Sequence, residues 1–229
     1  MTESMLELEN VSKVYNSAAG PIKALSNVSL KISAGDFVSI TGPNGSGKST
    51  LLHILGCLDR PTEGSVVIRR IKVKDLNRKS LAQFRSEGIG FVFQGGNLIP
   101  RMSVLGNVML PGMIQRGNNG NPRKRALELL EQFDLSGLSS KKGAYLSGGE
   151  EQIVAIAVAL MNQPKIVLAD EPTTFLDSYN SRKVIESLKE LNKDGITVVY
   201  VSHDPEEAGM AKRIIALRDG EMVKDGVKS

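Results

Sequence analysis

The stretch GPNGSGKST, from Gly42 to Thr50, has the residue types and spacing of a phosphate-binding loop. Its glycines let successive backbone N–H groups converge on phosphate oxygens, and a helix that begins at its end would add positive potential. Lys48 is expected to reach the β- and γ-phosphates of a nucleotide and to serve catalysis, while Ser49 offers a hydroxyl to Mg²⁺. The candidate nucleotide-binding residues are Gly42, Asn44, Gly45, Ser46, Gly47, Lys48, Ser49 and Thr50.

A pair of carboxylates follows a second apolar run, in KIVLADEPTT. A buried strand that ends in Asp170 and Glu171 would place both at the carboxyl edge of a sheet, where ligands bind in open α/β folds. Asp170 would hold Mg²⁺, directly or through water, and Glu171 would orient and deprotonate an attacking water. Without the phosphate loop, the same residues would be interpreted as an ordinary acidic turn.

A second glycine pair opens another expected helix, in LSGGEEQIVAIAVAL. Ser147 followed three residues later by Glu150 is a capping box, so the helix would begin with unpaired N–H groups and a positive dipole end. The Ser147 hydroxyl can accept a hydrogen bond from the helix backbone and still donate its own proton. Since the first loop already suits a phosphate, this motif alone does not identify the anion that the second helix N-terminus would bind.

The elements around these motifs predict an α/β fold. Short apolar runs predict buried strands at FVSIT, GIGFVF, KIVLAD and ITVVYVS, and helical stretches such as KSTLLHILGCL and SYNSRKVIESLKELN follow them. This alternation favours an α/β domain with a mainly parallel sheet. The alternating pattern of NVSLKI predicts a half-exposed strand, and SVVIRRIKV, which lacks intervening helices, predicts an antiparallel β subdomain beside the sheet.

One domain is expected, spanning residues 1–229, with a helical insert at about 97–161. The core and the β subdomain then comprise about 1–96 and 162–229. PRKRALELLEQF within the insert has a proline at a plausible first helical position, and RGNNGNP before it is expected to be a flexible joint.

Composition limits the possible classes of protein. The chain has 229 residues, 24% of them charged, and a formal net charge of +4 with interspersed basic and acidic residues, so nucleic acid is not an expected partner. The single cysteine, Cys57, lies in an apolar run and excludes a disulfide scaffold. The acidic N-terminus does not look like a signal peptide, and the longest apolar run, IVAIAVALM, is too short to span a membrane. We therefore expect a soluble protein of a reducing compartment.

The order of these motifs resembles the nucleotide-binding subunits of ATP-binding cassette (ABC) transporters, over essentially the whole chain. The matching elements are the glycine loop, Gln94 after GFVF, LSGG, VLADEP, the pair Leu176–Asp177, and SHD at residues 202–204. LGCLDRPTEG, IGFVFQ and NLIP look most like the branch of lipoprotein-release, macrolide-export and cell-division ATPases. The resemblance implies a P-loop NTPase (RecA-like) core with an antiparallel β subdomain and an inserted helical subdomain. It also implies ATP and Mg²⁺ as cofactors and a cytoplasmic protein that is peripheral on the inner face of the cell membrane.

The resemblance also supplies the missing anion, because in this family the second glycine motif binds ATP held by a neighbouring subunit. Ser147, Gly148, Gly149, Glu150 and Asp177 would then contact the partner's ATP. One helix end cannot readily cap an anion already cradled in the same chain, whereas two chains arranged head to tail would complete each other's sites. The partner is expected to be an identical chain or a related ATPase subunit, with ATP between the two.

Several single residues carry a role only through this resemblance. Gln94 would touch Mg²⁺ or the attacking water, His203 would contact the γ-phosphate as a catalytic residue, and Tyr15 would stack on adenine. Each has an ordinary alternative: a polar turn for Gln94, a structural histidine for His203, and an exposed tyrosine at a strand end for Tyr15. Asp177 would equally serve as a helix N-cap.

The chain departs from the family pattern in its second glycine motif, where related subunits read close to LSGGQQQRVAIARAL. Glu150 preserves the capping box but adds negative charge beside the expected γ-phosphate, which should weaken the contact across the pair. Ile153 and Val158 replace two arginines, so this helix is expected to be more deeply buried. TTFLD similarly stands where this branch often has TGNLD.

A membrane partner is implied as well. NLIPRMSVLGNVMLPGMI is apolar and contains Met102, Met109 and Met113, whose flexible side chains suit a groove for a helix of another protein. The resemblance implies that this helix belongs to an integral membrane permease. Packing inside the helical insert would explain the same residues. Two other functions stay open: a DNA-repair or chromosome-organising ATPase, which the lack of heptads and length between Gln94 and Leu146 disfavours, and a regulatory ATPase that drives a membrane protein without moving cargo.

Overall fold

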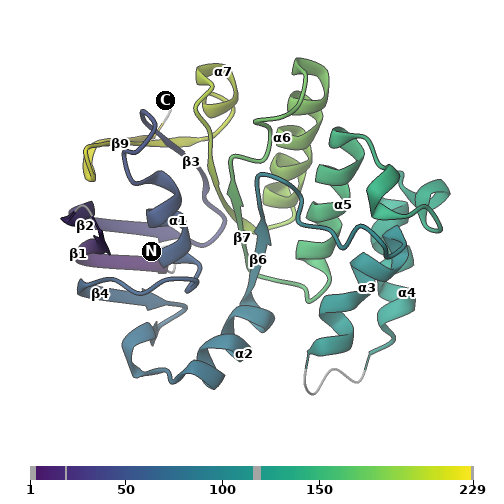
Figure 1. The fold of residues 1–229 in the computed structure, drawn as a ribbon, viewed down its shortest axis with the longest axis horizontal. Helices are drawn as coiled ribbons and strands as arrows, with labels where there is room; N and C mark the ends of the chain where they lie inside the picture. Colours follow the sequence, from purple (N-terminus) through teal and green to yellow (C-terminus); the bar gives the residue numbers. More distant parts are fainter. Residues whose placement is uncertain (1–3, 19, 116–119, 228–229) are drawn as a thin grey trace.

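The computed structural model describes residues 4–18, 20–115 and 120–227 (Figure 1). Its central sheet has six strands, in the spatial order β10 (Glu221–Val227), β9 (Arg213–Arg218), β3 (Phe37–Thr41), β8 (Thr197–Val201), β7 (Ile166–Asp170) and β6 (Ile89–Val92). The pairs from β9 to β6 are parallel, and β10 adds an antiparallel edge. The four strands that the sequence predicts as buried, β3, β6, β7 and β8, are neighbours in this sheet.

The N-terminal part of the chain forms a second, antiparallel sheet. Its strands, in spatial order, are β2 (Gly20–Ser33), β1 (Ser4–Ser17), β4 (Glu63–Ile68) and β5 (Ile71–Lys72). The alternation that predicts a half-exposed strand at NVSLKI is confirmed, because Val28, Leu30 and Ile32 are buried and the residues between them are exposed. The expected antiparallel β subdomain is therefore present.

Seven α-helices occur among the described residues: α1 (Lys48–Leu55), α2 (Arg78–Gly88), α3 (Val104–Ile114), α4 (Pro122–Gln132), α5 (Gly148–Leu160), α6 (Ser178–Lys193) and α7 (Pro205–Ala208). Short 3₁₀ turns occupy Val73–Asp75, Ser136–Leu138 and Gly143–Tyr145. Pro122 opens α4 as the sequence predicts, and Asn121 caps it by accepting a hydrogen bond from the backbone of Lys124. Residues 116–119 of the expected flexible joint lie outside the described residues.

The two faces of the central sheet bury different clusters of side chains. On β7, Ile166 and Leu168 pack with α1 and the antiparallel sheet, whereas Val167 and Ala169 pack with α3 to α6. Both faces are therefore covered, which explains the continuous apolar runs that identify these strands in the sequence. Figure 1 shows α1 on one side of the sheet and α5 on the other. The division near residues 97 and 161 stays a prediction, since the helical segment shares a core with the sheet.

Candidate functional site

The strand registers bring the sequence motifs to one edge of the central sheet. Val201 of β8 lies opposite Ile40 of β3 on one side and opposite Asp170 of β7 on the other. Ala169 of β7 lies opposite Val92 of β6. These four parallel strands therefore end together, and the polar segment that follows each of them leaves the sheet at the same edge. Continuing the β6–β7 register by two residues would put Gln94 opposite Glu171.

The phosphate loop runs from β3 to α1. Gly42 has a φ of 145°, and a Cβ atom there would strike the backbone of Leu217, so no other residue fits. Gly47, with a φ of 97°, precedes α1 and caps it without a side chain. The first N–H groups of α1 have no partner within the helix, as an anion site requires.

The Lys48 ammonium lies inside this loop. Its Nζ donates to the backbone carbonyl oxygens of Gly42 and Pro43, at 3.0 Å each, and the side chain is buried. The Oγ of Ser46 is also buried and has no hydrogen-bond partner in the described structure. A buried cation and an unsatisfied hydroxyl beside open helix N–H groups are the environment that a phosphate group would complete.

Asp170 is held by two side chains of α1. The Ser49 hydroxyl donates to Asp170 Oδ1 at 2.9 Å, and His53 Nε2 lies 3.4 Å from Asp170 Oδ2. Ser49 and His53 are four residues apart and therefore face the same side of the helix. His53 is a residue that the sequence analysis missed, although this spacing from Ser49 is the signal that identifies it.

The oxygen atoms around Asp170 fit Mg²⁺. This ion prefers oxygen ligands and is usually held by one or two carboxylates together with substrate phosphates. No group of three or more histidine, cysteine or acidic side chains forms a complete metal cage within residues 4–18, 20–115 and 120–227. The Asp170 carboxylate and the Ser49 hydroxyl therefore form a partial set of oxygen ligands, which phosphate oxygens could complete.

Glu171 and His203 face each other from the segments that follow β7 and β8. His203 Nδ1 lies 3.8 Å from Glu171 Oε2, and the same oxygen accepts a hydrogen bond from Thr174 Oγ1 at 3.0 Å. Glu171 has a φ of 45°, in the left-handed region that non-glycine residues rarely adopt. Such a conformation persists where the surroundings enforce it, and it often marks a functional site.

Gln94 follows β6 and is exposed, and among the residues that the structure describes no hydrogen bond or ion pair joins it to Asp170 or Glu171. Its neighbour is tied to the second glycine motif, however, because Gln152 Nε2 of α5 donates to the carbonyl oxygen of Phe93 at 2.9 Å. The structure therefore connects the Gln94 segment to α5.

Tyr15 lies beside the end of the phosphate loop. Its hydroxyl donates to Asp59 Oδ2 at 2.7 Å, and Lys13 Nζ stands 4.8 Å from the centre of its ring. Burial and the hydrogen bond to Asp59 raise the pKa of Tyr15, and a hydrogen bond with Thr50 partly opposes that shift. The ring is fixed next to the loop with part of its surface exposed, as adenine stacking requires.

The predicted capping box at the second glycine motif is confirmed. The backbone N–H of Ser147 donates to Glu150 Oε2 at 2.8 Å, and the backbone N–H of Glu150 donates to Ser147 Oγ at 3.3 Å. Lys141 Nζ also lies 3.1 Å from Glu150 Oε2. The hydrogen bond from the Ser147 backbone, aided by Lys141 and opposed by partial burial, lowers the pKa of Glu150. The negative charge expected beside the γ-phosphate is thus partly neutralised by Lys141.

The N-termini of α5 and α6 lie side by side. A Cβ atom on Gly149 would strike the side chain of Asn180, and one on Gly148 would touch Leu176. Asp177 caps α6, because its Oδ1 accepts from the Asn180 backbone at 2.9 Å and its Oδ2 from Asn180 Nδ2 at 2.6 Å. Asp177 is therefore the N-cap of α6, which is the alternative to its expected contact with the ATP of a partner chain.

The two arginine replacements in α5 have different surroundings. Ile153 is buried, as the apolar character of this helix predicts. Val158 is only partly buried and lines a groove of about 350 Å³ between α2, β6 and α5. Only Ile153 is therefore a core residue, whereas Val158 contributes to a surface.

Comparison with known proteins identifies the family to which the chain belongs. The model of the ABC transporter family matches residues 25–174, which is more than half of the chain. The uncharacterized ABC transporter ATP-binding protein MJ0796 of Methanocaldococcus jannaschii is 50% identical over 226 residues, covering 96% of this chain and 96% of that protein. The macrolide export ATP-binding/permease protein MacB of Escherichia coli is 46% identical over 223 residues, which are 97% of this chain but only 34% of MacB.

A solved structure agrees with the fold. The dimeric post-hydrolysis state of MJ0796 bound to ADP and Pi superposes with a TM-score of 0.90 at 49% identity, over 97% of this chain and 98% of that one. The expected P-loop fold with its antiparallel β subdomain is confirmed, and so is the resemblance to the macrolide-export branch. The phosphate loop, the carboxylates at the end of β7 and the capped second glycine motif accordingly belong to an ATP-binding, ATP-hydrolysing cassette, and the chain is a member of the ABC transporter family.

Proposed function

We propose that this chain powers a separate membrane permease by forming ATP-dependent head-to-tail pairs and hydrolysing ATP within them. One observation carries the proposal: the two helices whose N-termini suit phosphate pack against opposite faces of one sheet. α1 packs in the cluster on the first face, and α5 packs in the cluster on the second. We therefore expect a triphosphate at the N-terminus of α1 to lie away from Ser147 of its own chain and to receive that residue from another copy.

Each site would combine residues of two chains. One chain supplies the phosphate loop, with Lys48 at the β- and γ-phosphates and Tyr15 against adenine, while Ser49 and Asp170 hold Mg²⁺. The metal would neutralise phosphate charge and orient the oxygens. The other chain supplies Ser147 with the open helix N-terminus of α5.

Hydrolysis would depend on the groups at the strand ends. Glu171 would accept a proton from the attacking water, and His203 would donate a hydrogen bond to the γ-phosphate. Gln94 would contact Mg²⁺ or the water and, through the Phe93–Gln152 hydrogen bond, link the site to α5. Loss of the γ-phosphate removes the bonds that hold the pair closed, so the chemistry is converted into opening.

We propose that the permease docks in the groove between α2, β6 and α5. It is lined by Leu58, Arg85, Phe91, Phe93, Pro111, Val158 and other residues of α2, β6 and α5, and it is predominantly apolar. In the nearby methionine-containing segment, Met113 is 64% exposed, whereas Met102 and Met109 are partly buried. An apolar groove of this kind suits a helix of another protein.

No helix among the described residues is long and apolar enough to cross a membrane. We place the protein in the cytoplasm, on the inner face of the membrane.

The test uses the Glu171→Gln protein, which should bind ATP and Mg²⁺ but hydrolyse ATP very slowly. Size-exclusion chromatography with light scattering should find it dimeric with ATP and monomeric without. The Lys48→Ala protein is the control and should stay monomeric in both conditions. Monomers of Glu171→Gln at saturating ATP would contradict the proposal.

A further inference from the structure

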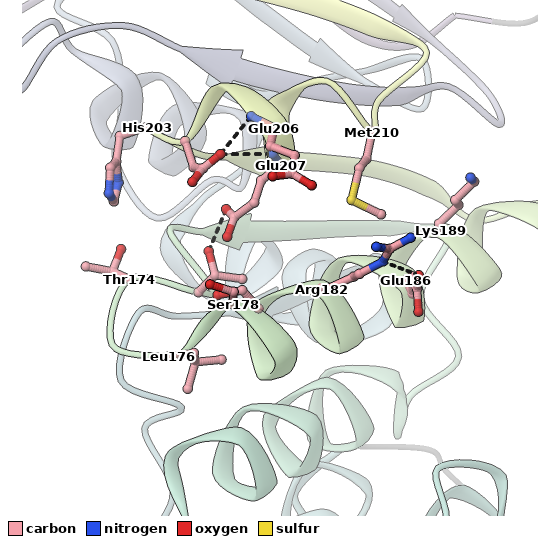
Figure 2. Close-up of a pocket in the computed structure, with 13 residues that line it drawn as sticks. Thr174, Leu176, Ser178, Arg182, Glu186, Lys189, His203, Glu206, Glu207 and Met210 are labelled. Carbon is pink, nitrogen blue, oxygen red and sulfur yellow. Dashed lines mark hydrogen bonds and ion pairs between the residues drawn. The ribbon is translucent and has the colours of Figure 1, made fainter.

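A cleft of about 560 Å³ lies between α6 and α7, next to the expected hydrolytic residues (Figure 2). Thr173 and Thr174 line it from the segment after β7, and His203 and Glu207 line it from the segment after β8. Figure 2 shows Glu207 pointing across the cleft toward the segment that carries Thr174. The two segments that hold Glu171 and His203 therefore meet at this acidic side chain.

Both segments donate to one oxygen atom of Glu207. Thr173 Oγ1 and Ser202 Oγ each donate to Glu207 Oε2 at 2.7 Å. Thr173 is two residues after Glu171, and Ser202 immediately precedes His203. Both hydroxyl residues are buried. Short hydrogen bonds to a carboxylate are the strong kind, so this oxygen clamps the two segments together.

Glu207 is itself held in place at both ends of its backbone. The Asp204 carboxylate accepts from the backbone N–H groups of Glu206 at 2.7 Å and of Glu207 at 3.2 Å, which caps α7. The Tyr200 hydroxyl donates to the Glu207 carbonyl oxygen at 2.7 Å. The carboxylate thus projects from a fixed backbone, as a positioning group requires.

We propose that Glu207 is a positioning residue that keeps Glu171 and His203 aligned for ATP hydrolysis. It acts through Thr173 and Ser202. The inference rests on the proposed roles of Glu171 and His203. Glu171 occupies a strained left-handed conformation that neighbouring contacts must enforce, and the Thr173 bond lies two residues away. Because a misplacement of about 1 Å can cost a rate factor on the order of 100, loss of the clamp should reduce turnover more than nucleotide binding.

The test compares Glu207→Leu, Glu207→Gln and the matched control Glu206→Gln, which changes an exposed glutamate of the same helix. Glu207→Leu should lower kcat roughly 10-fold or more while KM for ATP changes less than about 3-fold. Glu207→Gln keeps one oxygen acceptor and should recover part of kcat, and Glu206→Gln should match the wild-type protein. Equal kcat for Glu207→Leu and wild type, or parallel loss of kcat and ATP affinity, would overturn the proposal.

A double-mutant cycle removes dependence on one variant. Thr173→Ala should lower kcat in the wild-type background but have little further effect in Glu207→Leu, because the bond is already lost. If Glu207→Leu does not fold, Thr173→Ala combined with Glu207→Gln provides the same comparison, and additive effects would count against the clamp. A wild-type protein without ATPase activity would instead contradict the proposed function, so the two failures are distinguishable.

Discussion

Lys141 Nζ lies 3.1 Å from Glu150 Oε2 and partly neutralises this carboxylate of the second glycine motif. Removal of the carboxylate by Glu150→Gln should strengthen ATP-driven pairing, because glutamine retains the capping box without a negative charge beside the γ-phosphate. Lys141→Ala should weaken pairing, since it leaves the charge of Glu150 uncompensated. Sedimentation equilibrium in the Glu171→Gln background measures both dissociation constants. Unchanged or weaker association of Glu150→Gln would refute the electrostatic account.

Acid should reduce the contribution of Glu150 to folding. Its pKa in the folded protein lies below the usual value, so the carboxylate stabilises the fold when pH is above the unfolded-state pKa of about 4.3. That stability is lost as pH falls through the lower, folded-state pKa. Chemical unfolding at several pH values should give a wild-type advantage over Glu150→Gln near neutrality that shrinks toward pH 3. A pH-independent difference would contradict this linkage.

Asp170→Asn should separate nucleotide binding from metal use. The phosphate loop is untouched, so ATP should still bind, but loss of the carboxylate charge should raise the Mg²⁺ concentration needed for hydrolysis on the order of 100-fold and reduce kcat. Measuring ATPase activity against Mg²⁺ concentration checks the effect on hydrolysis. Electron paramagnetic resonance measures the affinity for Mn²⁺ as a substitute for Mg²⁺. Wild-type Mn²⁺ affinity in Asp170→Asn would exclude this residue as a ligand.

His53→Ala should have a smaller effect of the same kind. The side chain orients Asp170 Oδ2 without being an expected ligand, so its loss should weaken Mn²⁺ binding several-fold, roughly the 10-fold scale of groups that support metal ligands. His53→Asn is a shorter hydrogen-bonding replacement and should retain more affinity than His53→Ala. Identical Mn²⁺ affinities for wild type and His53→Ala would show that the contact does not position Asp170.

Cys57 should be chemically inert in the folded protein. Burial raises the pKa of this thiol to about 11, and the side chain is almost fully inaccessible. Since the thiolate is the reactive form, alkylation at pH 8 should be slow until urea unfolds the chain, whereupon one group per chain reacts rapidly. Mass spectrometry after timed labelling measures this. Rapid labelling of the native protein would contradict the packing of α1 against the sheets.

The sequence predicts best what depends on local patterns. β3, β6, β7 and β8 follow from short apolar runs, and α5 follows from its capping box and apolar residues. α2 was missed because only Leu81 and Gly88 of its residues are buried, which leaves no clear helical periodicity. β2 begins at Gly20, seven residues before the predicted strand, because only Leu25 of the additional residues is buried and they lack the alternation.

Contacts between distant residues could not be predicted in the same way. Ser49 and Asp170 are 121 residues apart, and only their shared motif context indicates that they meet. The pairing of Lys141 with Glu150 and the clamp by Glu207 on Thr173 depend on where loops fold back, which no local pattern specifies. The contacts of Ser147, Gly148, Gly149 and Asp177 with a partner's ATP stay predictions.

Complementation between two inactive variants tests the composite site most directly. Lys48→Ala disables a chain's own phosphate loop, and Ser147→Arg disables what that chain offers its partner. Each protein alone should show little ATPase activity. A mixture of the two proteins should regain a substantial fraction of the wild-type ATPase activity, because a mixed pair contains one site with both an intact loop and an intact Ser147. A mixture no more active than its components, with mixed pairs demonstrated by fluorescence energy transfer, would contradict the shared site.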